Sequence, residues 1–163
     1  SLLELARILS HKKPDKNIVF VATEGEELGA LGAASLAKRL KGLGLQDKVK
    51  VINIDSIGAK GEHLTIEGSK GIQGNKEIAK KIAQKSKQLG VSYRTSPKNY
   101  DTDAAEFEEN GFPAISLLWD WKKNMTNRPG YHLPADKPEN IDYNNVIKTT
   151  KVALASMMDL AQH

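Results

Sequence analysis

The stretch Asn17–Gly29, NIVFVATEGEELG, decides how the rest of the chain is interpreted. Ile18–Ala22 is a short apolar run rich in β-branched residues, which is typical of a strand buried on both faces of a parallel sheet. Glu24, Glu26 and Glu27 follow directly, around a glycine. Ligands of open α/β sheets bind at the carboxyl ends of the strands, so acids in this turn suggest a functional site. The structural alternative is that they stabilise the N-terminus of the next helix through its dipole.

The remainder of the chain alternates helical and strand patterns. Apolar residues at helical spacing predict helices, and short apolar or alternating runs predict strands. The expected helices cover 1–9, 28–40, 75–89, 103–110 and 142–162, and the expected strands cover 18–22, 48–58, 63–68, 91–94 and 114–119. This is the order of βαβ units, whose crossovers keep strands parallel and bring their carboxyl ends to one side. We therefore expect a single α/β domain over residues 1–163.

Length and composition narrow the classes of function. The 163 residues suit one domain, and the lack of cysteine means that any metal must be bound by His, Asp or Glu. The formal charge of +4 comes from scattered lysines with no nucleic-acid-binding motif, so we do not expect a nucleic-acid partner. No apolar run approaches the roughly 18 residues of a membrane-spanning helix, and we expect none.

Acidic residues and one histidine are expected to converge at the carboxyl edge of the sheet. In chain order they are Glu26, Glu27, Asp55, Asp103 and His132. Carboxylates that gather closely repel one another unless a cation lies between them. Zinc accepts carboxylate oxygen and imidazole nitrogen, and pairs of metals occur in carboxylate-rich hydrolase sites. Neighbouring glutamates can divide the work, since one can bind metal while the other acts as a general base.

Four segments occur in an order that resembles one known family. They are GEELG at 25–29, NIDSIG at 53–58, TDAAEF at 102–107 before NGFPAI at 110–115, and YHLPADKPENID at 131–142. Together they resemble the M28 family of zinc aminopeptidases, and the resemblance runs along the whole chain. It implies a three-layer sandwich in which helices cover a mostly parallel, mixed sheet. It also implies a metal-dependent enzyme that hydrolyses N-terminal residues from peptides.

The resemblance implies a role for each predicted site residue. Glu26 would be the general base that acts on a metal-bound water. Glu27 and His132 would hold one zinc ion, and Asp55 would hold a second one.

Four more residues are expected around these ligands, in a second layer or in the substrate pocket. Asp103 matches a family aspartate near the substrate, and Tyr131 is the neighbour of the predicted histidine ligand. Asp136 would orient a ligand, with capping or simple solvation as the alternative. Trp119 would line a pocket for the first side chain of the substrate, with packing of the loop as the alternative.

Two departures from the family pattern limit these expectations. The first metal-binding histidine of the family and the aspartate that bridges both metals precede the segment that Ser1–Arg7 resembles, and this chain lacks them. Since a catalytic zinc takes three protein ligands, we expect an N-terminally truncated domain with partial sites, which binds zinc weakly and is inactive alone. In addition, Ala104 stands where many members carry histidine. Asp101, two residues before Asp103, is an alternative match to the family aspartate.

Two other functions stay open at this point. A glutaminyl-cyclase-like enzyme would share the fold but use one zinc, and the pair Glu26 and Glu27 together with Asp55 favours hydrolysis. A non-catalytic binding or dimerisation module would be expected to have lost Glu26, Glu27 or His132, which are all present. Truncation is also expected to expose a sheet edge through which the chain associates with itself. The resemblance implies a parent protein that is secreted or lies in the cell envelope.

Overall fold

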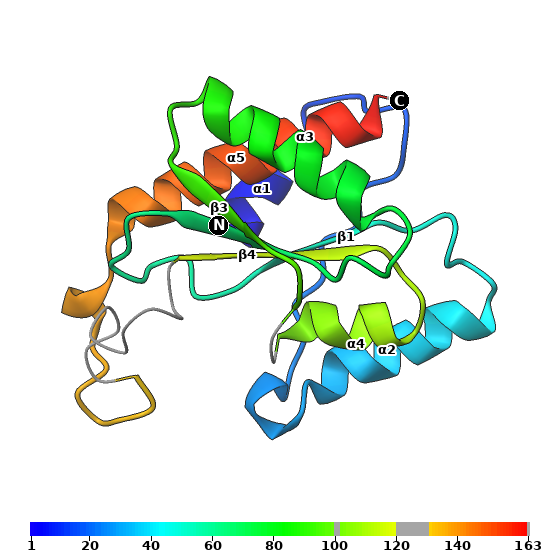
Figure 1. Cartoon of the computed structure of the whole chain (residues 1–163), viewed down its shortest axis with the longest axis horizontal. Coiled ribbons are helices and arrows are strands. Elements are labelled where there is room, and N and C mark those ends of the chain that lie inside the picture. Colours follow the sequence, from blue (N-terminus) through cyan, green and yellow to red (C-terminus); the bar gives the residue numbers. More distant parts are fainter. Residues whose placement is uncertain (100–101, 120–130, 163) are drawn as a thin grey trace.

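A mixed sheet separates two layers of helices in the computed structural model, which describes residues 1–99, 102–119 and 131–162. One face of the sheet is covered by α1 (Leu2–Leu9), α3 (Asn75–Gln88) and α5 (Tyr143–Ala161), and the other by α2 (Leu31–Gly42) and α4 (Asp103–Glu109) (Figure 1). Two short 3-10 helices, η1 (Glu26–Leu28) and η3 (Pro138–Asn140), precede α2 and α5. The three-layer α/β fold expected from the sequence is confirmed.

The described strands form a sheet in the order β1-β4-β2-β3. The strands are β1 (Val51–Ile54), β2 (Leu64–Glu67), β3 (Tyr93–Ser96) and β4 (Ala114–Trp119). β1 pairs with β4 and β2 pairs with β3 in parallel, whereas β2 and β4 are antiparallel. The carboxyl ends of β1 and β4 therefore lie at the same edge of the sheet.

Two hydrophobic clusters fill the space on either side of the sheet. The larger one lies under α3 and α5 and includes Leu64, Ile78, Ile115, Trp119 and Val152, all at most 1% exposed. The smaller one joins α2 to α4 and includes Ala33, Ala37, Ala104, Phe107 and Phe112. Small residues on α2 let α4 approach closely, which fixes the helix whose first residue is Asp103.

The predicted buried strand at Ile18–Ala22 is not observed, and that prediction is wrong for this chain. No strand is assigned there, and within the described residues no ladder joins this segment to the sheet. Val19 and Val21 are 78% and 44% exposed, while Phe20 packs partly buried against the larger cluster. The segment thus buries one side only, because it has no hydrogen-bonded neighbour in the described part of the chain.

One predicted helix start is also corrected. The helix expected from Leu28 begins at Leu31, because Gly29 and Ala30 adopt left-handed backbone conformations that separate it from η1. The helix predicted over 103–110 does begin at Asp103, and Thr102 in the cap position makes no side-chain cap hydrogen bond. Asp142, by contrast, does cap α5, since its side chain accepts hydrogen bonds from two backbone N–H groups.

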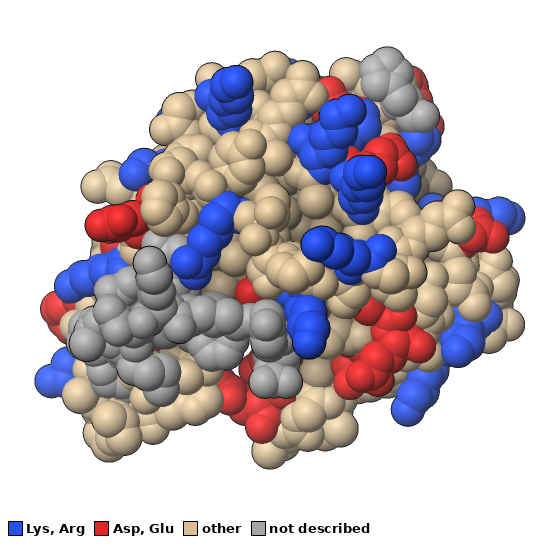
Figure 2. Space-filling view, in the orientation of Figure 1, with Lys and Arg blue, Asp and Glu red and all other residues tan. Residues whose placement is uncertain are grey.

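None of the helices in the described residues is both long and apolar enough to cross a membrane. On the face shown in Figure 2, lysine and arginine side chains lie scattered and intermixed with acidic ones.

Candidate metal centre

The glutamate turn, residues 23–29, presents two adjacent acids in one tight turn. Gly25 and Gly29 have φ values of +68° and +94°, a region that favours glycine, and they flank η1. The backbone N–H of Ala30 donates to the Glu26 carbonyl at 2.8 Å, which closes the turn. Glycine in this sequence is therefore what lets Glu26 and Glu27 occupy a turn of their own between the extended segment and α2.

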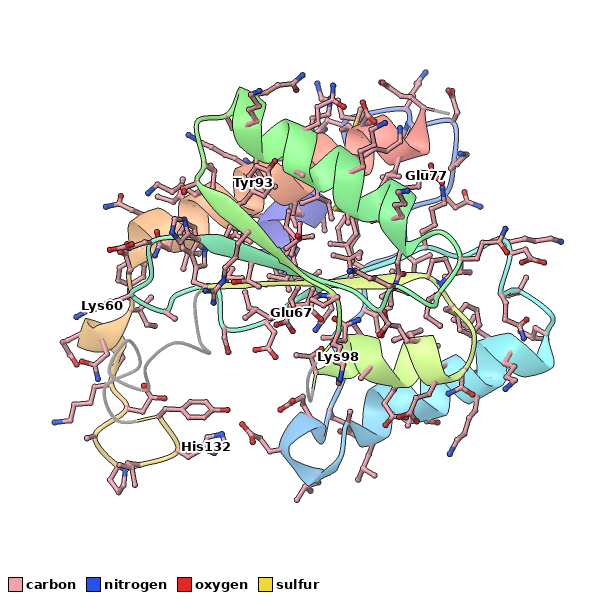
Figure 3. The ribbon with its side chains drawn as sticks, viewed as in Figure 1. Lys60, Glu67, Glu77, Tyr93, Lys98 and His132 are labelled. Carbon is pink, nitrogen blue, oxygen red and sulfur yellow. The ribbon has the colours of Figure 1, made fainter. Side chains whose placement is uncertain are left out.

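His132 lies against this turn from the other end of the chain. Its Nε2 atom is 2.9 Å from Oε1 of Glu27, across 105 residues of sequence. Figure 3 shows the His132 side chain pointing from its loop toward the segment that carries the glutamates. The Tyr131 ring stacks on the imidazole with the ring centroids 3.8 Å apart. Both members of the pair stay accessible, since their side chains are 54% and 67% exposed.

Backbone strain accompanies two of the predicted ligands. His132 itself has φ of +59°, and Ser56, directly after Asp55, has φ of +48°. Non-glycine residues rarely adopt such values, and they cluster at functional sites where the surrounding structure imposes them. The Ser56 hydroxyl donates to Oδ1 of Asp55 at 2.7 Å, and the Asp55 N–H donates to the Leu117 carbonyl on β4. Asp55 is thereby fixed at the end of β1.

Several acidic side chains lie close enough to Glu26 to affect its ionisation. Its pKa is raised above the ordinary value, first by burial and then by the charges of Asp55, Glu27 and Asp103, while His132 acts in the opposite direction. A like charge nearby and partial burial both disfavour the ionised carboxyl group. The predicted acids and the predicted histidine are therefore all near enough to act on Glu26, as the sequence led us to expect.

Asp103 faces the glutamate turn from the start of α4. Its Oδ2 accepts a hydrogen bond from the Thr23 hydroxyl, and its Oδ1 is buried with no hydrogen-bond partner in the described residues. The next residue, Ala104, is fully buried in the cluster between α2 and α4. The alternative match, Asp101, lies outside the described residues.

The donor chemistry fits zinc, but the described residues do not complete a site. A carboxylate oxygen and an imidazole nitrogen meet at Glu27 and His132, which is a donor set that zinc accepts. Among residues 1–99, 102–119 and 131–162, however, no group of three or more His, Asp or Glu side chains is placed to hold one metal ion. The contact between Glu27 and His132 therefore brings together two of the predicted zinc ligands.

Trp119 and Asp136, which were predicted to line the pocket or to orient a ligand, do not contact the predicted ligands in the described residues. Trp119 is 1% exposed, belongs to β4 and the larger cluster, and donates from Nε1 to the Thr149 hydroxyl at 2.7 Å. The prediction of a pocket residue is thus corrected, because its indole packs against α5. Asp136 is exposed, and its backbone N–H closes a turn onto the Leu133 carbonyl. Within the described residues its carboxylate has no hydrogen bond to His132.

Sequence reasoning missed the hydroxyl groups that hold the acids. Thr23 bonds Asp103, and Ser56 bonds Asp55. A second pair of hydroxyls, on Thr102 and Ser116, is 2.7 Å apart and joins the start of α4 to β4. The available signal was that Thr23, Ser56 and Thr102 each lie next to an acidic residue in the sequence, but which acid each would contact depends on the fold.

A mixed sheet between two layers of helices thus carries the glutamate turn and the loop histidine. The sequence profile of peptidase family M28 matches residues 1–157, and the chain belongs to this family.

Two relatives are similar to most of this chain. The chain is 27% identical over 146 residues to aminopeptidase YwaD of Bacillus subtilis and 30% identical over 148 residues to the alkaline phosphatase isozyme conversion protein of Escherichia coli. These alignments cover 86% and 84% of this chain but only 31% and 42% of the two relatives. The chain therefore spans well under half of their length.

The fold matches that of zinc aminopeptidases over nearly the whole chain. The structure of BSAP, a zinc aminopeptidase from Bacillus subtilis, superposes with a TM-score of 0.86 at 24% identity, over 99% of this chain and 40% of that one. The LapA aminopeptidase of Legionella pneumophila superposes with a TM-score of 0.80 at 21% identity, over 99% of this chain and 44% of that one. At these identities the likeness establishes the fold.

Proposed function

We propose that this domain belongs to a zinc-dependent aminopeptidase and that it supplies the general base and part of the metal-binding set. The observation that carries the proposal is the 2.9 Å contact between Nε2 of His132 and Oε1 of Glu27, directly beside Glu26. Family membership supports peptides as substrates.

The ligand assignment follows from the donors. Glu27 and His132 would hold one zinc ion, and Asp55, which leaves the end of β1, would hold a second. Zinc held by these residues would supply Lewis-acid chemistry for the scissile carbonyl. Tyr131, stacked on the imidazole, keeps the ring of His132 oriented toward Glu27.

Glu26 would move the proton. A general base works best when its pKa lies near the operating pH, and the burial and acidic neighbours of Glu26 raise its pKa in that direction. Glu26 would accept a proton from the attacking water and return it to the amine of the leaving peptide. Its neighbour Glu27 cannot share this role, because its carboxylate is engaged with His132.

We also propose that the chain by itself binds zinc weakly and does not hydrolyse peptides, since Glu27 and His132 give two of the three protein ligands of a catalytic zinc. Zinc would be titrated into the metal-free chain and into a Glu27→Ala, His132→Ala double variant, with leucyl-arylamide hydrolysis assayed in parallel. We expect the parent chain to release heat of zinc binding and the double variant to release none. We expect neither protein to hydrolyse the leucyl-arylamide. Hydrolysis by the metal-loaded chain contradicts inactivity, and equal binding by both proteins contradicts the ligand assignment.

A second proposal is self-association through the open side of the sheet. In the described residues β1 pairs with β4 alone, and Val19, in the extended segment before the glutamate turn, is 78% exposed. Unpaired strand edges with apolar side chains recruit other chains. Sedimentation velocity would show a concentration-dependent dimer that Val19→Lys abolishes and Leu43→Lys, at another exposed apolar residue, leaves intact. A monomer at all concentrations rules this proposal out.

A further inference from the structure

The Thr23 side chain joins two segments that each carry a site acid. Thr23 lies three residues before Glu26, and its part-buried hydroxyl donates to Oδ2 of Asp103, 80 residues further along the chain. One hydrogen bond therefore connects the glutamate turn to the first residue of α4.

The Asp103 side of this connection is rigidly supported. Ala104 is fully buried against the alanines of α2. At the other end of α4, the Glu108 carboxylate accepts from both the N–H and the hydroxyl of Ser69, at 2.8 and 2.6 Å. A helix held at both ends gives Asp103 a fixed position from which to hold Thr23.

The opposite side of the turn lies against α2 with no spare room. The N–H of Gly32 donates to the Glu24 carbonyl at 2.9 Å. A Cβ atom at Gly32 would lie 2.7 Å from the Glu24 nitrogen, closer than non-bonded atoms approach. The turn is thus anchored at Thr23 by Asp103 and at Glu24 by Gly32, immediately before Gly25 and the short helix η1.

We infer that Thr23 is a positioning residue for the metal centre, because its hydroxyl bond to Asp103 sets the place from which Glu26 and Glu27 face the site. The inference rests on the proposed function and adds a supporting residue to that site. It assigns Asp103 the role of an anchor for the turn. Since Oδ1 of Asp103 has no hydrogen-bond partner in the described residues, loss of Thr23 would leave the whole carboxylate unpaired there.

The first test measures the turn without metal. Amide hydrogen exchange of Leu28, Gly29 and Ala30, whose N–H groups bond within the turn, would be followed in the chelator-treated chain. Thr23→Val is expected to speed their exchange about tenfold, which corresponds to about 1.4 kcal/mol, whereas Thr23→Ser keeps the hydroxyl and the parent rate.

Thr102→Val is the matched control. It removes the adjacent hydroxyl, which lies 2.7 Å from that of Ser116, and leaves the bond between Thr23 and Asp103 in place. It is expected to lower the melting temperature without changing exchange in the turn. If Thr23→Val and Thr102→Val change exchange in the turn equally, the inference is overturned.

The second test is zinc titration of the same variants. About tenfold weaker binding by Thr23→Val, restored by Thr23→Ser, is the expected result. Unchanged zinc affinity in Thr23→Val overturns the role at the metal centre. If the parent chain binds no zinc while exchange in the turn still responds to Thr23→Val, the positioning of the turn stands and the proposed metal function fails.

Discussion

Nε2 of His132 and Oε1 of Glu27 lie 2.9 Å apart, although 105 residues separate them in the chain. In the metal-free chain this contact is a hydrogen bond, and in the loaded domain both atoms would turn to the zinc ion. The pair is accessible to solvent, so it contributes little to stability. Its importance is that it brings a carboxylate oxygen and an imidazole nitrogen together as metal donors.

Single substitutions in this pair should therefore affect zinc much more than folding. We expect His132→Ala and Glu27→Ala each to weaken zinc binding by more than about tenfold, and the double variant to lose little more, because residues that bind one ion act as a unit. The unfolding free energy should change by less than about 1 kcal/mol. Titration calorimetry and urea unfolding measure the two effects. His11→Ala, at an exposed histidine, is the control, and additive losses in the double variant would contradict a shared ion.

Glu26 should make the stability of the metal-free chain depend on pH in a defined direction. Its folded pKa is raised, so the folded state binds more protons than the unfolded state between the ordinary value of 4.5 and the raised one, and stability falls as pH rises through that window. Glu26→Gln removes the ionisation. We expect it to raise the melting temperature near neutral pH and to have no such effect below about pH 4.

The comparison would be made in chelator, with Glu24→Gln at an exposed glutamate of the same turn as the control. If Glu26→Gln lowers the melting temperature at neutral pH, the charges around Glu26 do not oppose its ionisation.

Asp159 should show the opposite dependence. Lys81 and Lys85 of α3 hold its pKa at about 2 through hydrogen bonds from their ammonium groups, and so link α3 to α5. The stabilisation is present above the ordinary value of 3.8 and is lost as pH falls through about 2. We expect Asp159→Asn to lower the free energy of unfolding by about 1 kcal/mol at neutral pH, as for ion pairs in contact with water.

Urea unfolding at neutral pH and near pH 2 measures this difference, with Glu109→Gln at an exposed position of α4 as the control. If Asp159→Asn lowers the free energy of unfolding equally at both pH values, the effect comes from packing and not from the ion pairs.

Two glycines of α2 offer a matched pair of substitutions. An added Cβ at Gly32 meets the backbone of Glu24 at 2.7 and 2.8 Å, while at Gly42 it meets nothing within 4 Å. We expect Gly32→Ala to destabilise by about 1–3 kcal/mol through displacement of the glutamate turn, and Gly42→Ala to be neutral or to stabilise by up to about 1 kcal/mol. Urea unfolding checks both, and zinc titration should show weaker binding for Gly32→Ala only. Similar stabilities of the two variants would mean that the turn yields easily.

The sequence by itself determined the class of fold and the strand β4, and its motifs supply the predicted site acids. Apolar runs and helical spacing are local signals, so Ala114–Trp119 was predicted with its observed bounds and α5 within a residue at each end. The motifs around Glu27, Asp55 and His132 are equally local, because each depends on a few consecutive residues.

Only the tertiary structure decided which residues meet. Ile18–Ala22 has the composition of a buried strand, yet a strand requires a hydrogen-bonded neighbour, and the described residues provide none. Trp119 looks like a pocket residue in sequence, but the register of β4 turns its ring toward α5. The bond between Thr23 and Asp103 spans 80 residues, and a contact at that range exists only after α2 and α4 have packed on the same face of the sheet.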